Sequence, residues 1–320
     1  MKILTNADKL FSRLSTYVYS TKSTTLSQVI SQVTGKGVHY TVTTGFRFRR
    51  IIWHFQRHNK LAKLMKTNPS TASLIQVNPR LLYKYLGHYL ALNLSTKDKL
   101  AMLTSHYHYF INYLRPEFFE DILHKTYIWQ FHQESDCFAI SLFFSSGLDW
   151  EGDLTIVLEY NKISIYAIRF IVVGSMKNSV FNQSIFVGGV QGGKDFDLIK
   201  QATKSLFDIS PVALLMAALQ GIALACNFNW VWGVGNDKHL AIGRACFNFD
   251  AFWNSLGGEK QLNQLYNLPV PFPEKPISSI KANHRSRTLR KREFKNRLTE
   301  QVRNHFEAQL QSPFERSMQP

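Results

Sequence analysis

Cysteine, long apolar runs and, over a long N-terminal stretch, acidic residues are what this sequence has least of. Its 320 residues include three cysteines, Cys137, Cys226 and Cys246, an odd number without paired spacing. This excludes a disulfide framework and favours a reducing compartment. The longest apolar run, 211–226, is shorter than the roughly 20 residues of a membrane-spanning helix. Residues 1–30 are interrupted by Ser, Thr, Lys and Asp, so they predict no secretory signal. We therefore expect a cytoplasmic protein without a transmembrane segment.

The positive charge is segregated. No acid occurs from Lys9 through Lys97, a stretch with 14 Lys and Arg, and residues 281–297 hold eight basic residues against one acid. Since the net charge is +16, removing +14 and +7 leaves −5 for the rest of the chain. Such basic segments attract anionic partners, and a solvated face that only aids solubility is the plain alternative. The candidate anion-binding residues are Arg47, Arg49, Arg50, Arg285, Arg287, Arg290, Lys291 and Arg292.

The anionic partners that this charge could attract are phospholipid or lipopolysaccharide head groups, nucleic acid and phosphate-bearing cofactors. On a lipid surface the protein would be peripheral at the inner membrane. Nucleic acid is disfavoured because no recognisable nucleic-acid-binding module accompanies the basic residues. The oligomeric state has no signature in the sequence.

Hydrophobic periodicity predicts an α+β fold, with a mostly antiparallel sheet and packed helices. Helical patterns cover 47–66, 80–93 and 98–114, the last one capped at Ser95. After Pro116 the period changes to that of strands, and 154–160 alternates as a half-buried antiparallel strand does. The expected strands are 127–132, 137–144, 154–160, 163–173, 184–190 and 230–234.

Helices return in the second half of the chain. We expect one from Asp195 or Asp197 to about 207, a buried one over 211–226 capped by Ser210, a short one near 249–256, and a basic one over 284–311. Residues 268–273, rich in proline, predict an extended connector. The chain then divides into a poorly ordered leader (1–45), a basic helical region (46–115), an α+β core (116–280) and a basic C-terminal helix and tail (281–320).

Several short motifs between about residues 87 and 297 resemble the VirK/YbjX family of bacterial proteins, in the order that the family has them. They are His106-Tyr107, Glu151-Gly152-Asp153-Leu154, Gly188-Gly189-Val190-Gln191-Gly192, Thr203-Lys204, Gly233-Val234-Gly235-Asn236 with His239, Asp250-Ala251-Phe252-Trp253 and the basic run 285–297. Asp153 stands where the family usually has Glu. The resemblance implies a role in envelope integrity, virulence or resistance to cationic antimicrobial peptides. It implies no catalytic residue.

The segment from Gly188 to Lys194 is the best candidate for ligand binding. Glycines let a backbone approach a phosphate, and the following helix start offers free N–H groups. The segment lacks the Walker pattern, and the antiparallel strands before it do not suit a dinucleotide fold. The order of strands, Gln/Gly-rich loop, helix and strand resembles the acyl-CoA-binding core of the Gcn5-related N-acetyltransferases, although the usual motif spacing is not met. That resemblance implies acyl-CoA bound at Gln191, Gly192, Gly193 and Lys194. A tight turn is the plain alternative.

Three residues are candidate catalytic groups. His239, just after the 230–234 strand, could act as a general base, while Glu151 and Asp153 could pair as acid and base. A surface histidine and a solvated strand entry explain the same residues without function. His106 and His108, two apart on a helix, point in different directions, so we expect no metal site.

Two function classes therefore stay open. The first is a non-enzymatic factor supporting the envelope, with no cofactor and with its basic ends on anionic lipid. The second is an acyl-CoA-dependent acyltransferase that uses the loop from Gln191 to Gly193.

Overall fold

The computed structural model describes residues 51–145, 150–174, 176, 179–243 and 247–311. The chain divides into two compact units, Met1–Phe55 and Gln56–Pro320, and the sheet lies in the second. No helix in these described ranges is long and apolar enough to span a membrane.

Helices precede the sheet. They are α4 (Phe55–Thr67), α5 (Pro69–Val77), the 3₁₀ helix η1 (Pro79–Leu86), α6 (Thr96–Tyr113) and α7 (Pro116–His124). The start of α6 confirms its prediction, since the Ser95 hydroxyl accepts the Asp98 N–H at 3.1 Å. The helix predicted over 80–93 is confirmed only as far as Leu86, as the 3₁₀ helix η1, because the chain is extended at Gly87 and runs on irregularly. Helix α7 was missed, because the change of period after Pro116 was interpreted as the start of strands. Pro116 in fact stands at the first position of the helix, which proline favours.

The sheet has eight strands in the order β1-β2-β3-β4-β5-β6-β8-β7, and the predicted α+β fold with a mostly antiparallel sheet is confirmed. Only β5 and β6 are parallel neighbours among the described strands. Strands β3 and β4 have the predicted bounds, whereas β5 extends two residues further, so that much of the glycine-rich segment is strand. The strands are β1 (Thr126–Gln133), β2 (Asp136–Phe144), β3 (Leu154–Tyr160), β4 (Ile163–Val173), β5 (Ser184–Gly192), β6 (Trp230–Val234), β7 (Glu259–Lys260) and β8 (Leu265–Pro269).

Strand β3 is buried along its whole length, which corrects the expectation of a half-buried strand. Its polar residues are satisfied inside the protein. Glu159 accepts a hydrogen bond from the Ser141 hydroxyl at 2.8 Å, and the Thr155 and Ser145 hydroxyls lie 2.6 Å apart. Alternation of polar and apolar residues therefore marks a strand with one polar buried face rather than one facing solvent.

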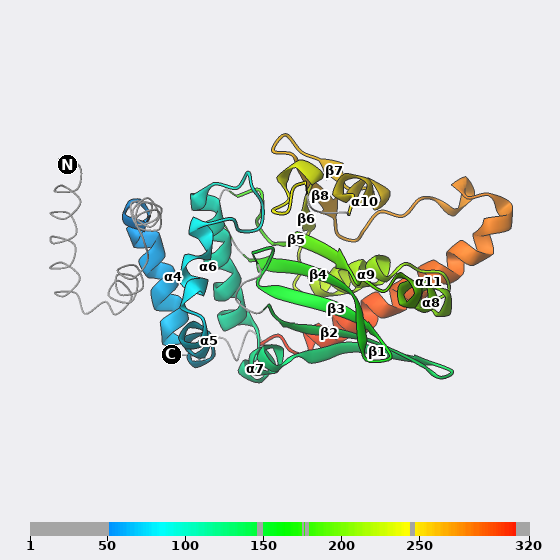
Figure 1. Cartoon of the computed structure of the whole chain (residues 1–320), viewed down its shortest axis with the longest axis horizontal. Helices are drawn as coiled ribbons and strands as arrows, with labels where there is room; N and C mark the ends of the chain where they lie inside the picture. The colour runs from blue at the N-terminus through cyan, green and yellow to red at the C-terminus, as the bar shows by residue number, and fades with distance from the viewer. Residues whose placement is uncertain (1–50, 146–149, 175, 177–178, 244–246, 312–320) are drawn as a thin grey trace. The chain divides into compact units, whose positions relative to one another are not determined.

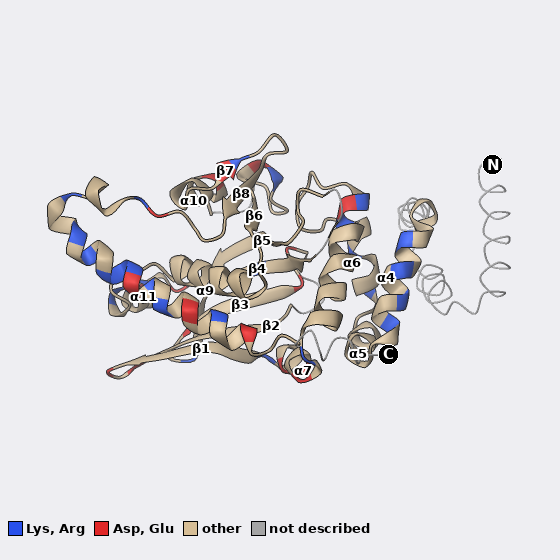
Figure 2. Ribbon diagram, turned by 180° about the vertical axis from the view of Figure 1, so that it is seen from behind, with Lys and Arg blue, Asp and Glu red and all other residues tan. Residues whose placement is uncertain are grey.

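Two helices lie between β5 and β6, namely α8 (Phe196–Ser205) and α9 (Pro211–Ala225). After β6 come the 3₁₀ helix η2 (Asn236–Lys238), α10 (Phe249–Ser255), the 3₁₀ helix η3 (Ile277–Ser279) and the long helix α11 (Ala282–Glu307). Figure 2 shows α9 and α11 together on one side of the sheet. The predicted burial of α9 and close approach at Gly221 are confirmed, since a Cβ there would lie 2.5 Å from the Thr299 carbonyl oxygen of α11. The Ser210 side chain, contrary to expectation, makes no capping hydrogen bond.

Candidate functional site

Strands β5 and β6 separate part-way along the sheet. They pair only over Ser184–Val187 and Trp230–Gly233, whereas β5 stays paired with β4 as far as Gly192. Beyond Val187, β5 therefore runs five residues past its last partner in β6. Ligands of open sheets bind where neighbouring strands part in this way.

Four polar side chains meet at this separation, and we call them the β5/β6 cluster: Glu151, Arg169, Gln191 and His239. Arg169 Nη1 donates to Glu151 Oε2 at 3.0 Å and to Gln191 Oε1 at 3.1 Å. His239 Nε2 lies 3.0 Å from Glu151 Oε1. Glu151 and Arg169 are each about a fifth exposed, so a molecule in solvent can reach them.

Two glycines of β5 make room for Glu151. A Cβ on Gly188 would lie 2.0 Å from the Glu151 carbonyl oxygen, and one on Gly189 would lie 2.1 Å from its carboxylate. The absence of side chains here serves the close approach of the protein's own Glu151. The sequence had suggested a ligand for the same space.

The ring of His239 is fixed from several sides. Its Nδ1 accepts the Ala241 N–H at 3.1 Å, which leaves the proton on Nε2, and its ring stacks on Phe249 at 4.3 Å. The Nε2–H is not aligned on the carboxylate, so its contact with Glu151 is mainly electrostatic. The Nδ1 atom is thus engaged by the Ala241 N–H, while Nε2 lies beside the Glu151 carboxylate, and the role of His239 as a general base stays a prediction.

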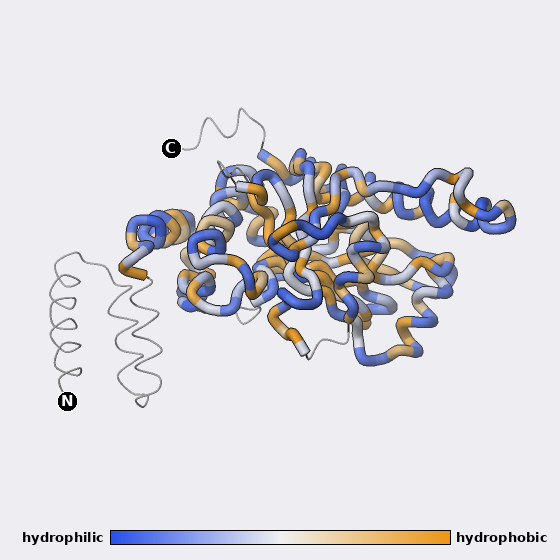
Figure 3. Tube along the Cα trace, turned by 90° about the horizontal axis from the view of Figure 1, so that it is seen from above, coloured by the Kyte–Doolittle hydropathy of each residue, from blue (hydrophilic) through white to orange (hydrophobic). Residues whose placement is uncertain are grey.

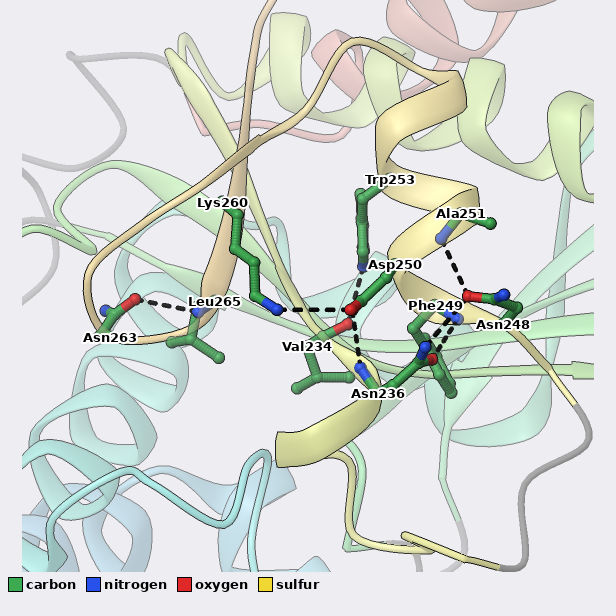
Figure 4. Close-up of polar contacts among 10 residues, drawn as sticks. All are labelled: Val234, Asn236, Asn248, Phe249, Asp250, Ala251, Trp253, Lys260, Asn263 and Leu265. Atoms are coloured by element: carbon green, nitrogen blue, oxygen red, sulfur yellow. Dashed lines mark hydrogen bonds and ion pairs between the residues drawn. The ribbon is translucent and has the colours of Figure 1, made fainter.

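A polar corner holds the turn that carries His239 (Figure 4). The Asp250 carboxylate accepts the Asn236 N–H at 2.9 Å, and the Asn236 side chain accepts the Phe249 N–H at 2.7 Å. Trp253 Nε1 donates to the Val234 carbonyl at 2.8 Å. The end of β6, η2 and the start of α10 are thus tied into one unit, and His239 follows η2 directly in the chain.

Glu151 is ionised in this setting. Burial alone would raise the pKa of its carboxyl, but His239 and Arg169 together outweigh burial and hold the pKa below its ordinary value. The cluster thus presents a carboxylate that is suited to a cationic or hydrogen-bond-donating group of a ligand.

Comparison with known proteins identifies the family. The family model described as "Protein of unknown function (DUF535)" matches residues 41–304. The chain belongs to the DUF535 family. It is 26% identical over 253 residues to the "Uncharacterized protein YbjX" of Escherichia coli (strain K12), covering 74% of this chain and 76% of that protein. The resemblance to the VirK/YbjX family is thereby confirmed. No solved structure matches the chain.

The motifs that this DUF535 chain shares with VirK/YbjX proteins converge in space. Glu151, Gln191 and His239 come from three of the motifs and lie within the β5/β6 cluster. The Asp250 carboxylate holds the turn before His239 by accepting the Asn236 N–H. Segments up to 99 residues apart in the sequence thus build one site.

Asp153 is separate from this cluster. Its carboxylate accepts hydrogen bonds from Lys84 Nζ at 2.8 Å, from the Tyr89 hydroxyl and from the Tyr107 hydroxyl at 3.4 Å. Asp153 is 1% exposed and Lys84 is fully buried. Burial would raise the pKa of Asp153, but Lys84 above all holds it below its ordinary value. Glu151 and Asp153 therefore contact different cations and do not share a proton.

The segment from Gln191 to Lys194 is only partly free for a ligand. A Cβ on Gly192 would lie 2.9 Å from the Tyr166 ring, and the Gly193 N–H donates to the Ile165 carbonyl at 2.8 Å. The side chain of Asp195 accepts the Leu198 N–H and so occupies the start of α8. Gln191 and Lys194 are exposed, and they are the two side chains that this segment offers to an anion.

The basic run of α11 is largely engaged with the protein itself. Arg285 donates to the Ile280 carbonyl, and Lys291 donates to the Asp208 carbonyl at 2.6 Å. Arg287 pairs with Asp208 at 2.6 Å, and Arg292 pairs with Glu274 at 3.2 Å.

Arg290 is exposed and makes no ion pair with the described residues. Lys and Arg still predominate along the first turns of α11 (Figure 2), and hydrophilic residues are frequent at this end of the chain trace (Figure 3, right). Arg47, Arg49 and Arg50 lie outside the described residues.

Two charged residues were missed from the sequence, Arg169 of the β5/β6 cluster and Lys84, the partner of Asp153. Each is a lone charge inside an apolar or aromatic stretch, Ile168-Arg169-Phe170 and Tyr83-Lys84-Tyr85. A charged side chain in such a setting needs a partner of opposite charge inside the protein. The position of each charge in an apolar or aromatic stretch was therefore the sequence feature that could have identified it.

Proposed function

We propose that this DUF535 protein binds an acyl-CoA where β5 and β6 separate and transfers the acyl group to an acceptor. The observation that supports this most is the parallel pair of β5 and β6, whose strands part after Val187 and Gly233. Strands that part in this way hold acyl-CoA in the Gcn5-related N-acetyltransferases, which the chain resembles in its order of strands, Gln/Gly-rich loop, helix and strand. The exposed Lys194 and Gln191 at the end of β5 would face the pyrophosphate.

The chemistry is a substitution at the thioester carbonyl. The C–S bond of the acyl-CoA breaks, a C–N or C–O bond to the acceptor forms, and the acceptor proton passes to the departing thiolate. Glu151 is the group in the cluster that can hold the acceptor N–H or O–H, and Arg169 and His239 fix its carboxylate. Asp153 takes no direct part, because all three of its contacts are buried.

Ligand-induced stabilisation tests this proposal. CoA, acetyl-CoA or a long-chain acyl-CoA at 100 times its dissociation constant should stabilise the protein by about 2.7 kcal/mol. In a chain of 320 residues, an unfolding entropy of about 2.1 cal/mol/K per residue converts this into a rise of about 4 °C in the thermal midpoint. Lys194→Glu should weaken the shift, because it puts a negative charge beside the pyrophosphate. Lys97→Glu is the matched control, since this exposed lysine lies in the first turn of α6, where an acid suits the helix. No shift for the parent at millimolar ligand would contradict the proposal.

The envelope role that the VirK/YbjX resemblance implies has a separate support, the basic surface of α11. Its first turns are exposed, and their cations outnumber their acids. On this second candidate, the protein would sit peripherally on anionic lipid or lipopolysaccharide and act in envelope integrity, virulence or peptide resistance.

Vesicle flotation tests that candidate. Neutralising Lys281, Arg290 and Lys295 to Gln should reduce binding to vesicles of anionic phospholipid, since each basic residue near such a surface contributes about 1 kcal/mol. None of the three is needed for the hydrogen bonds that dock α11. Neutralising Lys97, Lys162 and Lys204 instead removes the same charge from other exposed positions. Equal loss in both triple variants would show that net charge matters and not the α11 surface.

A further inference from the structure

The connection between η1 and α6 binds the residues that precede both partners of the Glu151–His239 contact. The Leu90 N–H donates to the Trp150 carbonyl at 2.8 Å, next to Glu151. The Leu92 N–H donates to the Lys238 carbonyl at 2.9 Å, next to His239. One short segment therefore spans the two chain segments that bring the carboxylate and the imidazole together.

This connection is itself held rigidly. Tyr89, Leu90 and Ala91 are completely buried, and Leu90 adopts a left-handed backbone conformation with φ of 62°. A leucine reaches that conformation only where its surroundings determine it. The segment is thus a fixed support and not a loose loop.

A buried ion pair locks the same connection to the Glu151 segment. Lys84 of η1 and Tyr89 both bind the Asp153 carboxylate, two residues after Glu151. Gly152 between them lies so close to β4 that a Cβ would be 2.5 Å from the Phe170 nitrogen. Glu151 is therefore anchored on both sides, at Trp150 and at Asp153, by the 84–92 segment.

The contact of Glu151 with Arg169 is more open to solvent than the Lys84–Asp153 pair. Arg169 and Glu151 are each about a fifth exposed, so water competes for their ion pair. The Lys84–Asp153 pair is shielded from water and is held by further hydrogen bonds.

We infer that Lys84, Asp153 and the segment Tyr89–Leu92 form a bracket that sets the position of Glu151 against His239. These are positioning residues, and the inference rests on the proposed function only where it takes Glu151 and His239 as the groups that meet the substrate. Lys84 and Asp153 act on the reaction through Glu151 and touch no ligand themselves.

The test removes the ion pair without leaving a buried charge. In Lys84→Met/Asp153→Asn both charges are gone and the side-chain volumes are nearly kept. The matched control is Lys125→Met/Glu159→Gln, since Lys125 and Glu159 lie 2.6 Å apart at the other end of β3 with no contact to Glu151. Tyr89→Phe is a milder variant that removes one hydrogen bond to Asp153.

Two measurements separate positioning from general stability. Heteronuclear NMR follows the Nε2 resonance of His239, which we expect to move in Lys84→Met/Asp153→Asn, and less in Tyr89→Phe, as the carboxylate shifts. Acyl transfer should fall on the order of 10²-fold in the double variant, because a misplacement near 1 Å costs that much, while the dissociation constant for CoA stays the same. The control pair should leave both readouts at the parent value.

The outcomes distinguish this inference from the proposed function. A parent that neither binds nor uses acyl-CoA overturns the proposed function, and the His239 resonance then still tests the bracket. An unmoved resonance and unchanged transfer in Lys84→Met/Asp153→Asn overturn the bracket alone. An equal change in Lys125→Met/Glu159→Gln also overturns it, because the effect would then be general loosening of the sheet.

Discussion

Lys84→Met alone is expected to lower the free energy of unfolding by about 3–5 kcal/mol at pH 7, the usual cost of leaving one partner of a buried ion pair uncompensated. Lys84 is 0% exposed and Asp153 is 1% exposed, so water cannot replace the lost ammonium group. Urea unfolding monitored by tryptophan fluorescence measures the loss. The loss should shrink as the pH falls, because without Lys84 the folded-state pKa of Asp153 rises above the unfolded value and protonation then favours the folded state.

Two further variants show whether the buried charge is the cause. Lys84→Met/Asp153→Asn should recover most of the stability, since no charge is left inside. Arg287→Met also removes the cation of an ion pair, but Asp208 is half exposed, and this change should cost at most about 1 kcal/mol. If Lys84→Met cost no more than Arg287→Met, the Asp153 site would not be as closed to water as its geometry indicates.

The secondary structure could be predicted where the cause is local. Strands β3 and β4 have the predicted bounds because their β-branched and aromatic residues run between clear turn residues. Helix α9 starts at Ser210-Pro211 as predicted, since proline fits the first position of a helix whatever packs against it. In contrast, residues 87–94 have a helix-like pattern of apolar residues but form an irregular connection. The reason is tertiary, since the Tyr89 hydroxyl binds Asp153 and the Leu90 N–H binds the Trp150 carbonyl.

The candidate site was predicted as separate residues and not as one arrangement. Glu151, Gln191 and His239 were each named from local motifs, but their meeting depends on the point where β6 leaves β5 and on the path of residues 150–153 across β4. Neither the separation of the two strands nor the path of residues 150–153 can be predicted from a few neighbouring residues of the sequence. Arg169 enters the site through a bulge in the β4–β5 register, which sequence periodicity does not reveal. The site is a product of non-local packing, although its residue types are visible in the sequence.

Acid is expected to destabilise the protein between pH 7 and 5, and His106 should be a main cause. Burial lowers the pKa of this histidine from 6.5 to about 4, and the smaller effects of its neighbours, Asp153 raising and Lys84 lowering it, do not reverse this. The unfolded chain therefore takes up a proton below pH 6.5, whereas the folded protein does not until about pH 4. Stability is lost as the pH falls through this window, by about 2 kcal/mol between pH 7 and 5 for this one residue.

His106→Asn separates this contribution from the others. The Asn side-chain oxygen can replace Nδ1 as acceptor of the Val172 N–H, which His106 accepts at 3.2 Å, and it does not titrate. The free energies of unfolding measured by urea titration at pH 7 and pH 5 should then differ by about 2 kcal/mol less than in the parent. A pH dependence remains, because burial and then Lys66 lower the pKa of His58 to about 4 as well. Asp153 does not contribute in this window, since its lowered pKa costs stability only below its ordinary value of 3.8. Replacement of the exposed His132 by Asn is the control and should leave the difference unchanged. An undiminished difference in His106→Asn would mean that the folded protein accommodates a charged His106, which the neighbouring Asp153 carboxylate would have to stabilise.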